Sequence, residues 1–262
     1  MPQEDQEIRL YEMEYADGRQ ARIYENGEVM HSAAYTEEGC HYDLVFDYMK
    51  TMNVIFDLSD SIHDILLIGG AGYSYPKYVI SRYPDIRMDV VDIDPMAFET
   101  AKMYFYLDEL IRDFDLENNR RLIPVTDDGR HYLETTEKTY DVIINDAYNG
   151  IVPVVSLITA EACRTVKSRL RENGMYVINV PGYKRMKKSK YMLDVIASLQ
   201  TVFRSVIVIR AAGRFAGSYT CNYIVAASDC YDKAEGMLKY DLNDASVITD
   251  ENAESIEENY HF

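Results

Sequence analysis

The sequence predicts an α/β fold built on a mostly parallel sheet, and three observations support this. From residue 64 onward, short apolar segments alternate with amphipathic ones, as expected when helices cover both faces of a parallel sheet. The first apolar segment, 65–68, ends in a glycine-rich turn that leads into a helix. The last two apolar segments are separated only by residues 210–220, so we expect them to form an antiparallel pair. Together these features predict a Rossmann-like fold.

Seven strands and several helices are expected in this region. The strands are 65–68, 88–93, 121–125, 142–145, 175–180, 206–209 and 223–226. The helices include 76–83, 95–110, 160–170 and 191–199.

The N-terminal part predicts a small antiparallel sheet and a linking helix. Segments 9–15 and 21–24 alternate polar and bulky residues, and the dipeptides 17–18 and 26–27 supply the positive φ of tight hairpin turns. A helix is expected over 37–56. The expected boundaries are 1–57 for the hairpin sheet and linking helix, 58–240 for the α/β domain, and 241–262 for a loosely attached acidic tail.

Composition restricts the classes of function. The 262 residues carry a formal net charge of −17 and are 47% hydrophobic, so the chain can bury a core and repels nucleic-acid phosphates. No apolar run approaches the roughly 20 residues that cross a bilayer, and the first seven residues are acidic and polar, unlike a secretory signal. We therefore expect a soluble cytoplasmic protein without a nucleic-acid or membrane partner.

The four cysteines lack CxxC spacing, so we expect no metal site. The basic segment 184–190 fits a solvated loop opening a helix better than an anion-binding patch.

The glycine-rich turn contains Gly69, Gly70 and Gly72, between a buried strand and a helix. Small residues let a ligand approach the backbone closely, and the helix N-terminus offers free N–H donors. Alone, the turn fits a tight turn without a ligand equally well. Asp92 favours a ligand, because it ends the next strand about 20 residues later, where a carboxylate reaches ribose hydroxyls in nucleoside-binding α/β folds. Asp94 is expected to cap the following helix.

A third acidic element follows the third strand, where Asp127, Asp128 and Gly129 occur in succession. We expect Asp128 to accept the adenine amino group, Gly129 to lie beside it, and Asp127 to cap the next helix, although the two acids can exchange roles. The glycine turn, the ribose acid and the adenine acid predict a fold of the S-adenosylmethionine-dependent methyltransferase type, to which the small N-terminal β-sheet is added.

These elements, followed by a later Asp, resemble in their order the spermidine synthase family of polyamine aminopropyltransferases. The resemblance runs from about residue 65 to 180 and is most specific around the fourth strand. There Asp146 falls on the family's catalytic acid, and Pro153, Ser156, Leu157 and Thr159 are also in register. We assign Pro153 to the cofactor pocket on this basis.

Aminopropyl transfer explains an acid at Asp146. A neutral amine attacks a carbon beside a sulfonium, and amines are protonated at neutral pH, so a carboxylate must take the proton. The alternative is a strand-end Asp that binds loop amides. Tyr42 and Asp43 stand where the family shows Tyr followed by His or Gln, and Tyr148 and Asn149 flank Asp146. We expect these four residues to surround the acceptor.

The chain also departs from the family pattern. Gly72 stands where the family has an Asp that holds the amino group of decarboxylated S-adenosylmethionine, and Asn149 replaces the second acid of the catalytic loop. The loop 211–219 lacks the family's Tyr-Pro-Ser-Gly segment. Without an acid at 72, the carboxylate of ordinary S-adenosylmethionine is better tolerated.

Three functions are therefore open. The first is aminopropyl transfer, from decarboxylated S-adenosylmethionine or S-adenosylmethionine, to a small-molecule amine. The second is methyl transfer from S-adenosylmethionine to a small acceptor, and the third is a non-catalytic nucleoside-binding or oligomerisation module. The N-terminal hairpin with its long helix favours the first, whereas Gly72 and Asn149 favour the other two. The resemblance implies a homodimer.

Overall fold

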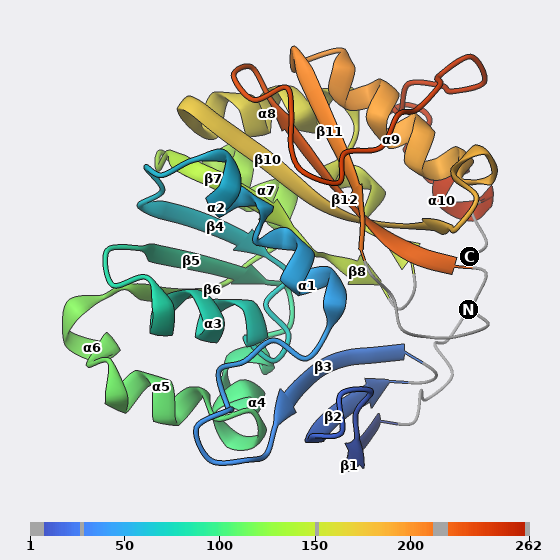
Figure 1. Cartoon of the computed structure of the whole chain (residues 1–262). Coiled ribbons are helices and arrows are strands. Elements are labelled where there is room, and N and C mark those ends of the chain that lie inside the picture. The colour runs from blue at the N-terminus through green and yellow to red at the C-terminus, as the bar shows by residue number, and fades with distance from the viewer. Residues whose placement is uncertain (1–7, 27–28, 150–151, 212–219, 260–262) are drawn as a thin grey trace.

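The structure, a computed structural model, describes residues 8–26, 29–149, 152–211 and 220–259. Its centre is a seven-stranded sheet in the order β11-β12-β10-β7-β4-β5-β6 (Figure 1). The bounds are β4 (Asp64–Ile68), β5 (Arg87–Asp92), β6 (Leu122–Thr126), β7 (Tyr140–Asn145), β10 (Leu170–Tyr183), β11 (Ser205–Arg210) and β12 (Thr220–Ser228). Neighbouring strands from β6 to β10 run parallel, whereas β12 is antiparallel to both β10 and β11. The predicted α/β fold is confirmed.

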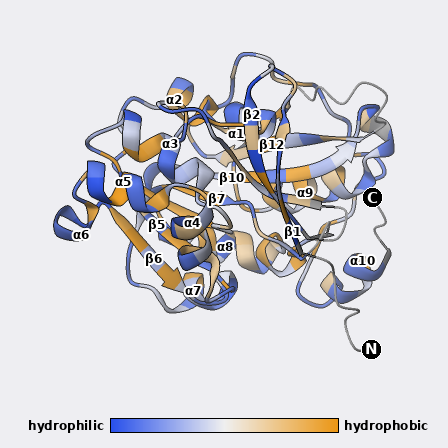
Figure 2. Cartoon of the chain, turned by 90° about the horizontal axis from the view of Figure 1, so that it is seen from below, coloured by the Kyte–Doolittle hydropathy of each residue, from blue (hydrophilic) through white to orange (hydrophobic). Residues whose placement is uncertain are grey.

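Helices cover both faces of this sheet. Because successive side chains of a strand point to opposite faces, β4 places Ile65 and Leu67 in one apolar cluster and Leu66 and Ile68 in the other. The first cluster also includes apolar residues of α3 to α6, and the second includes those of α7 to α9. Figure 2 shows the resulting contrast between apolar strands such as β6 and polar outer helices such as α6.

The helices after β4 differ from the predicted ranges by one or two residues at their ends, except in residues 95–110. Their bounds are α3 (Ser74–Arg82), α4 (Ala97–Tyr104), α5 (Leu107–Asp113), α6 (Leu116–Asn119), α7 (Gly129–Thr135), α8 (Ala160–Arg169), α9 (Lys190–Gln200) and α10 (Ala253–Asn259), with 3-10 turns η1 (Val155–Leu157) and η2 (Met186–Lys188). The helix expected over 95–110 is interrupted at Tyr106, whose φ of 61° is left-handed. Within the described ranges, no helix is both long and apolar enough to cross a membrane.

Three antiparallel strands form the small N-terminal sheet, in the order β1-β2-β3. Their bounds are β1 (Ile8–Glu14), β2 (Gln20–Asn26) and β3 (Val29–Tyr35). Gly18 has φ +84°, as expected for the first hairpin turn. Gly27, in the second predicted turn, lies outside the described residues.

Strand β3 packs against the start of α3. The Ser74 hydroxyl donates to the Ala33 carbonyl at 2.8 Å, and the Ser32 hydroxyl accepts from the Gly72 N–H at 2.7 Å. The small sheet therefore closes one side of the glycine-rich turn, as Figure 1 shows for β3 below the large sheet.

The long helix predicted over 37–56 is wrong. The chain instead forms turns and then two short helices, α1 (Asp47–Met52) and α2 (Val54–Leu58). Gly39 has φ +82°, which no helix accommodates. Leu44, Val45 and Phe46 are buried in the core, although they lie in an irregular segment. Their burial, and not a helix, accounts for the apolar spacing that predicted one.

The tail predicted to be loosely attached is in fact anchored as far as residue 259. Ile248 is fully buried, and its carbonyl accepts from the Ala160 N–H at 2.8 Å. Asp250 forms an ion pair of 3.1 Å with Arg130. Buried apolar side chains, backbone hydrogen bonds and an ion pair thus fasten the acidic segment beside α8.

Candidate active site

A cavity of about 1260 Å³ opens at the carboxyl ends of the parallel strands. Strand β4 lies between β5 and β7, so the chain turns to opposite sides of the sheet at this point, and α/β folds bind ligands at such switch points. Of the residues predicted for the site, the cavity is lined by Gly69, Gly70, Gly72, Asp92, Asp128, Gly129, Asp146, Tyr148 and Asn149. The sheet therefore brings together residues that are up to 80 positions apart in the sequence.

The glycine-rich turn passes very close to the end of β7. Gly69 has φ +92°, and a Cβ at this position would lie 2.5 Å from the carbonyl oxygen of Asp146. The N–H of Asp146 in turn donates to the Ile68 carbonyl at 2.9 Å. Gly69 is therefore required both for its conformation and for the close approach of the two strand ends.

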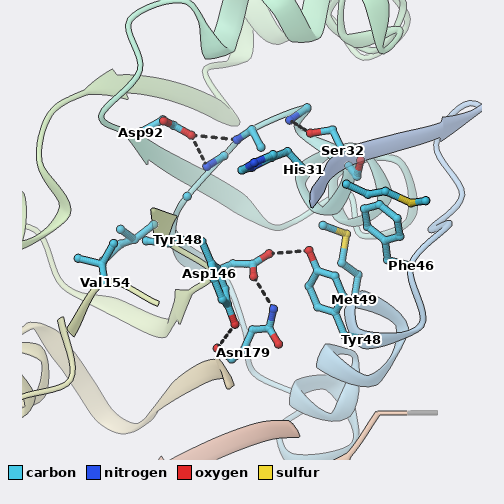
Figure 3. A pocket seen from close by; sticks show the side chains of 18 of the residues that line it. His31, Ser32, Phe46, Tyr48, Met49, Asp92, Asp146, Tyr148, Val154 and Asn179 are labelled. Atoms are coloured by element: carbon cyan, nitrogen blue, oxygen red, sulfur yellow. Dashed lines mark hydrogen bonds between the residues drawn. The ribbon is translucent and has the colours of Figure 1, made fainter. Parts of the chain in front are cut away.

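Asp92 stabilises the glycine-rich turn. Its Oδ2 accepts from the N–H groups of Gly70 and Ala71, at 2.7 and 2.9 Å, as the dashed lines in Figure 3 show. Its Oδ1 accepts from the Asp94 N–H at 2.9 Å. Asp94 accepts from the Met96 N–H at 2.8 Å, but Met96 is the N-cap of α4, so the expectation that Asp94 caps this helix is wrong. Asp92 thus links the ends of β4 and β5.

Asp128 takes the helix-capping role that we expected for Asp127. Asp128 is the N-cap of α7, accepting from the His131 N–H at 2.9 Å, so the expectation that Asp127 caps this helix is wrong. Asp127 contacts the His131 ring at 2.9 Å and raises the pKa of that imidazole. Both acids line the cavity. A Cβ on Gly129 would meet the Ile68 side chain, so helix and strand pack closely here.

Gly72 has no space for a side chain. A Cβ there would lie 2.7 Å from the Cβ of Ser32, and the Gly72 N–H donates to the Ser32 hydroxyl. His31, the preceding residue of β3, also lines the cavity, and its buried Nε2 has no hydrogen-bond partner among the described residues. Burial lowers the pKa of His31, while Asp92 opposes this effect. Strand β3 therefore places a histidine and a serine beside the glycine-rich turn, and sequence reasoning missed both.

Asp146 receives two hydrogen bonds inside the cavity. Tyr48 of α1 donates its hydroxyl to Oδ2 at 3.1 Å, and the Asn179 amide of β10 donates to Oδ1 at 2.8 Å (Figure 3). Burial raises the pKa of Asp146 to about 7, and the two hydrogen bonds oppose that shift. A carboxylate with such a pKa exchanges protons near neutral pH.

Tyr148 and Asn149 follow Asp146 in a two-residue strand, β8 (Tyr148–Asn149), which pairs with β9 (Val152–Pro153). The Tyr148 hydroxyl donates to the backbone carbonyl of Asn179 at 2.8 Å. Asn149 is exposed at the rim of the cavity. Pro153 does not line the cavity, because it is buried opposite Tyr148, and Val154 lines it instead.

Tyr42 and Asp43 also lie outside the cavity. The Tyr42 hydroxyl donates to Asp113 at 2.8 Å, and Asp43 forms an ion pair of 3.0 Å with Arg19. Because the segment before α1 is irregular, the tyrosine that reaches Asp146 is Tyr48, six residues later. No local pattern in the sequence distinguishes Tyr48 from the other tyrosines near it.

Asn179 was missed as well. Its signal is a polar residue within the apolar run Val177–Ile178–Asn179–Val180, at the carboxyl end of a strand parallel to β7. Such a residue needs a partner when buried, and Asn179 is only 3% exposed. In the part of the chain that the structure describes, no group of three or more His, Cys, Asp or Glu side chains is arranged to hold a metal ion.

The fold and the cavity define a methyltransferase-type α/β protein with a glycine turn and strand-end acids. A family model for the spermine/spermidine synthase domain matches residues 41–234, and the chain belongs to this family. The polyamine aminopropyltransferase of Vibrio vulnificus is 35% identical over 118 residues, covering 44% of this chain and 36% of the relative. That of Chromobacterium violaceum is 28% identical over 137 residues, covering 52% and 49%. The chain thus spans less than half the length of these relatives.

Solved structures share the fold. A probable spermidine synthase from Corynebacterium glutamicum has a TM-score of 0.67 at 23% identity, covering 85% of this chain and 76% of that one. A spermidine synthase in complex with the transition-state analogue AdoDATO has a TM-score of 0.60 at 17% identity, covering 96% and 86%. Human methyltransferase-like protein 13 in complex with SAH has a TM-score of 0.55 at 20% identity, covering 81% and 91%.

Proposed function

We propose that the chain transfers an aminopropyl group from decarboxylated S-adenosylmethionine to a small amine, with Asp146 as the proton acceptor. The observation that carries this proposal is the position of Asp146, whose carboxylate faces the same cavity as the glycine turn and has a pKa near 7. Membership of the family and the names of the relatives support the same reaction class.

The reaction needs a neutral amine, and Asp146 generates it by accepting a proton from the ammonium form. An alkyl ammonium gives a proton to Oδ1 or Oδ2 of Asp146, and the freed lone pair attacks the propyl carbon bound to sulfur. The new N–C bond forms as the C–S bond breaks, and its electron pair stays on sulfur, leaving a neutral thioether. Tyr48 and Asn179 hold the carboxylate in place for this transfer.

The remaining predicted residues serve the nucleoside in this proposal. Asp92 already holds the turn, and its carboxylate is placed at the strand end where ribose hydroxyls bind in such folds. Asp127 and Asp128 lie at the next strand end, and we assign them, with Gly129, to the adenine side of the cavity.

The tail of the donor meets an altered surface. Since Gly72 excludes an acid, the unpartnered Nε2 of His31 is the polar atom available there, and a neutral imidazole accepts a hydrogen bond from an ammonium. Because position 72 carries no acid, it does not repel the carboxylate of S-adenosylmethionine. This is the observation that favours the second candidate, methyl transfer from S-adenosylmethionine.

Homodimer formation and a cytoplasmic location follow from resemblance and composition, and sedimentation and localisation experiments test them.

Calorimetry and a product assay separate the candidates. Methylthioadenosine, S-adenosylmethionine and its decarboxylated form are titrated into the protein, and product formation is then followed with putrescine. We expect methylthioadenosine release with the decarboxylated donor, whereas release of S-adenosylhomocysteine from ordinary donor supports methyl transfer.

The variant Asp146→Asn tests the assigned role of the acid. We expect turnover to fall by at least ~100-fold, the usual size of a general-base contribution, with methylthioadenosine affinity unchanged. Asp108→Asn, on the exposed side of α5, is the matched control and keeps full activity. If Asp146→Asn lost both turnover and methylthioadenosine affinity, or kept both, Asp146 would not be the proton acceptor.

A further inference from the structure

Asn179 lies between two polar partners. Its Nδ2 donates to Asp146 Oδ1 at 2.8 Å, and its Oδ1 accepts from Nδ2 of Asn222 at 2.8 Å. Three side chains from three different strand regions therefore form a directed chain of hydrogen bonds that ends on the carboxylate.

The sheet register explains this contact. In the antiparallel β10–β12 ladder, Asn222 lies opposite Pro181, two residues after Asn179. Residues two apart on a strand share a face, so Asn222 and Asn179 are diagonal neighbours on the cavity side.

Asn222 determines which way the Asn179 amide faces. An asparagine presents an oxygen on one side and an NH₂ on the other, and only the oxygen can accept from the Asn222 amide. With its oxygen engaged, Asn179 directs the NH₂ toward Asp146. A flipped amide would direct its oxygen at the carboxylate, and two acceptors would then oppose each other.

We propose that Asn222 is a positioning residue for Asp146, acting by fixing the orientation of the Asn179 amide. It does not touch the reacting atoms itself. The proposal rests on the role of Asp146 as proton acceptor, because orientation matters to the reaction only if the carboxylate exchanges the proton.

Few other groups near Asp146 change charge around neutral pH. Tyr48 of α1 and Tyr148 of β8 interact with it, and burial raises the pKa of both phenols well above 10, so they stay neutral. Among the described residues, the acids that line the cavity with Asp146 are Asp47, Asp92, Asp94, Asp127, Asp128 and Glu257, and the histidine and lysine that line it are His31 and Lys184. A shift in the titration of Asp146 therefore reports on its hydrogen-bond donors.

The test is a double-mutant cycle with Asn222→Leu and Asn179→Leu, and Asn222→Ala as a smaller replacement. Infrared spectroscopy follows the protonated carboxyl band that Asp146→Asn removes, and the pH profile of methylthioadenosine release follows the reaction. For Asn222→Leu and Asn222→Ala we expect the midpoint of the carboxyl titration to rise by about 0.5 to 1 pH unit, the size of one hydrogen bond. The double variant is expected to match Asn179→Leu alone.

Unchanged midpoints in both Asn222 variants overturn the proposal. So does an additive shift in the double variant, because Asn222 would then act independently of Asn179. The infrared titration needs no turnover, so failure of the proposed function shows separately, as an absence of methylthioadenosine release from the unaltered protein with every amine.

Discussion

The carboxylate proposed to accept the proton also weakens the fold at high pH. The pKa of Asp146 is about 7 in the folded chain against 3.8 for the unperturbed group. An acid whose pKa rises on folding holds its proton more tightly when folded, so the free energy of unfolding falls as the pH rises from about 4 to 7. Three pKa units correspond to about 4 kcal/mol, and water in the cavity screens part of this, leaving about 2 to 4 kcal/mol.

Replacing Asp146 with Asn removes this pH dependence. The amide oxygen still accepts from Asn179, and the amide NH₂ can donate to the Tyr48 hydroxyl, so both contacts survive without a charge. Between pH 5 and pH 8.5 we expect the unaltered protein to lose about 2 kcal/mol more stability than Asp146→Asn does. The variant that abolishes turnover is thus expected to be the more stable protein at alkaline pH.

Urea unfolding at the two pH values measures this directly. The chain has 23 tyrosines and no tryptophan, so tyrosine fluorescence and far-UV circular dichroism report the transition. Asp108→Asn is the control, and all other titrating groups cancel in the comparison. Parallel loss of stability in the unaltered protein and in Asp146→Asn would refute the argument that burial raises the pKa of this acid.

Three further changes test the site. Asp92→Ala is expected to weaken methylthioadenosine binding by about 1–3 kcal/mol in calorimetry, since two turn amides lose their acceptor, and equal affinity would show that the turn does not depend on Asp92. Tyr48→Phe is expected to slow turnover roughly tenfold and to move the acidic limb of the pH profile upward, because Asp146 loses one donor; an unchanged profile contradicts this. Gly72→Ala is expected to lower stability by about 1–3 kcal/mol through its clash with Ser32. Ser32→Gly is expected to restore only part of this loss, because it also removes the acceptor of the N–H at position 72; no recovery at all would place the strain elsewhere.

The glycine turn is supported from three directions. Asp92 holds it from β5, the end of β7 touches it at Gly69, and Ser32 holds it from the small sheet. The small sheet is therefore part of the site and not an independent appendage. Ser32 of β3 fills the space in which a side chain at position 72 would lie.

Parts of the fold were predictable because they depend on local patterns. Runs of apolar residues between glycine and polar breaks located the strands of the large sheet, although their ends differ by a few residues. Helix 37–56 failed for a physical reason: buried residues of an irregular segment, such as Val45, have the same apolar spacing as a helix face. The tail prediction failed because apolar residues within the acidic segment, such as Ile248, pack against the core.

What the sequence determined by itself was where the strands β4, β5 and β7 end, to within one residue. Gly69, Asp92 and Asp146 each follow an apolar strand, and parallel strands place their carboxyl ends at one edge, so their meeting in a cavity was predictable. Only the tertiary structure decided which side chains complete the site. Tyr48 contacts Asp146 across 98 residues, and Asn179 contacts it across 33. Such contacts depend on how separate elements pack and on the register of distant strands, and no local pattern encodes either.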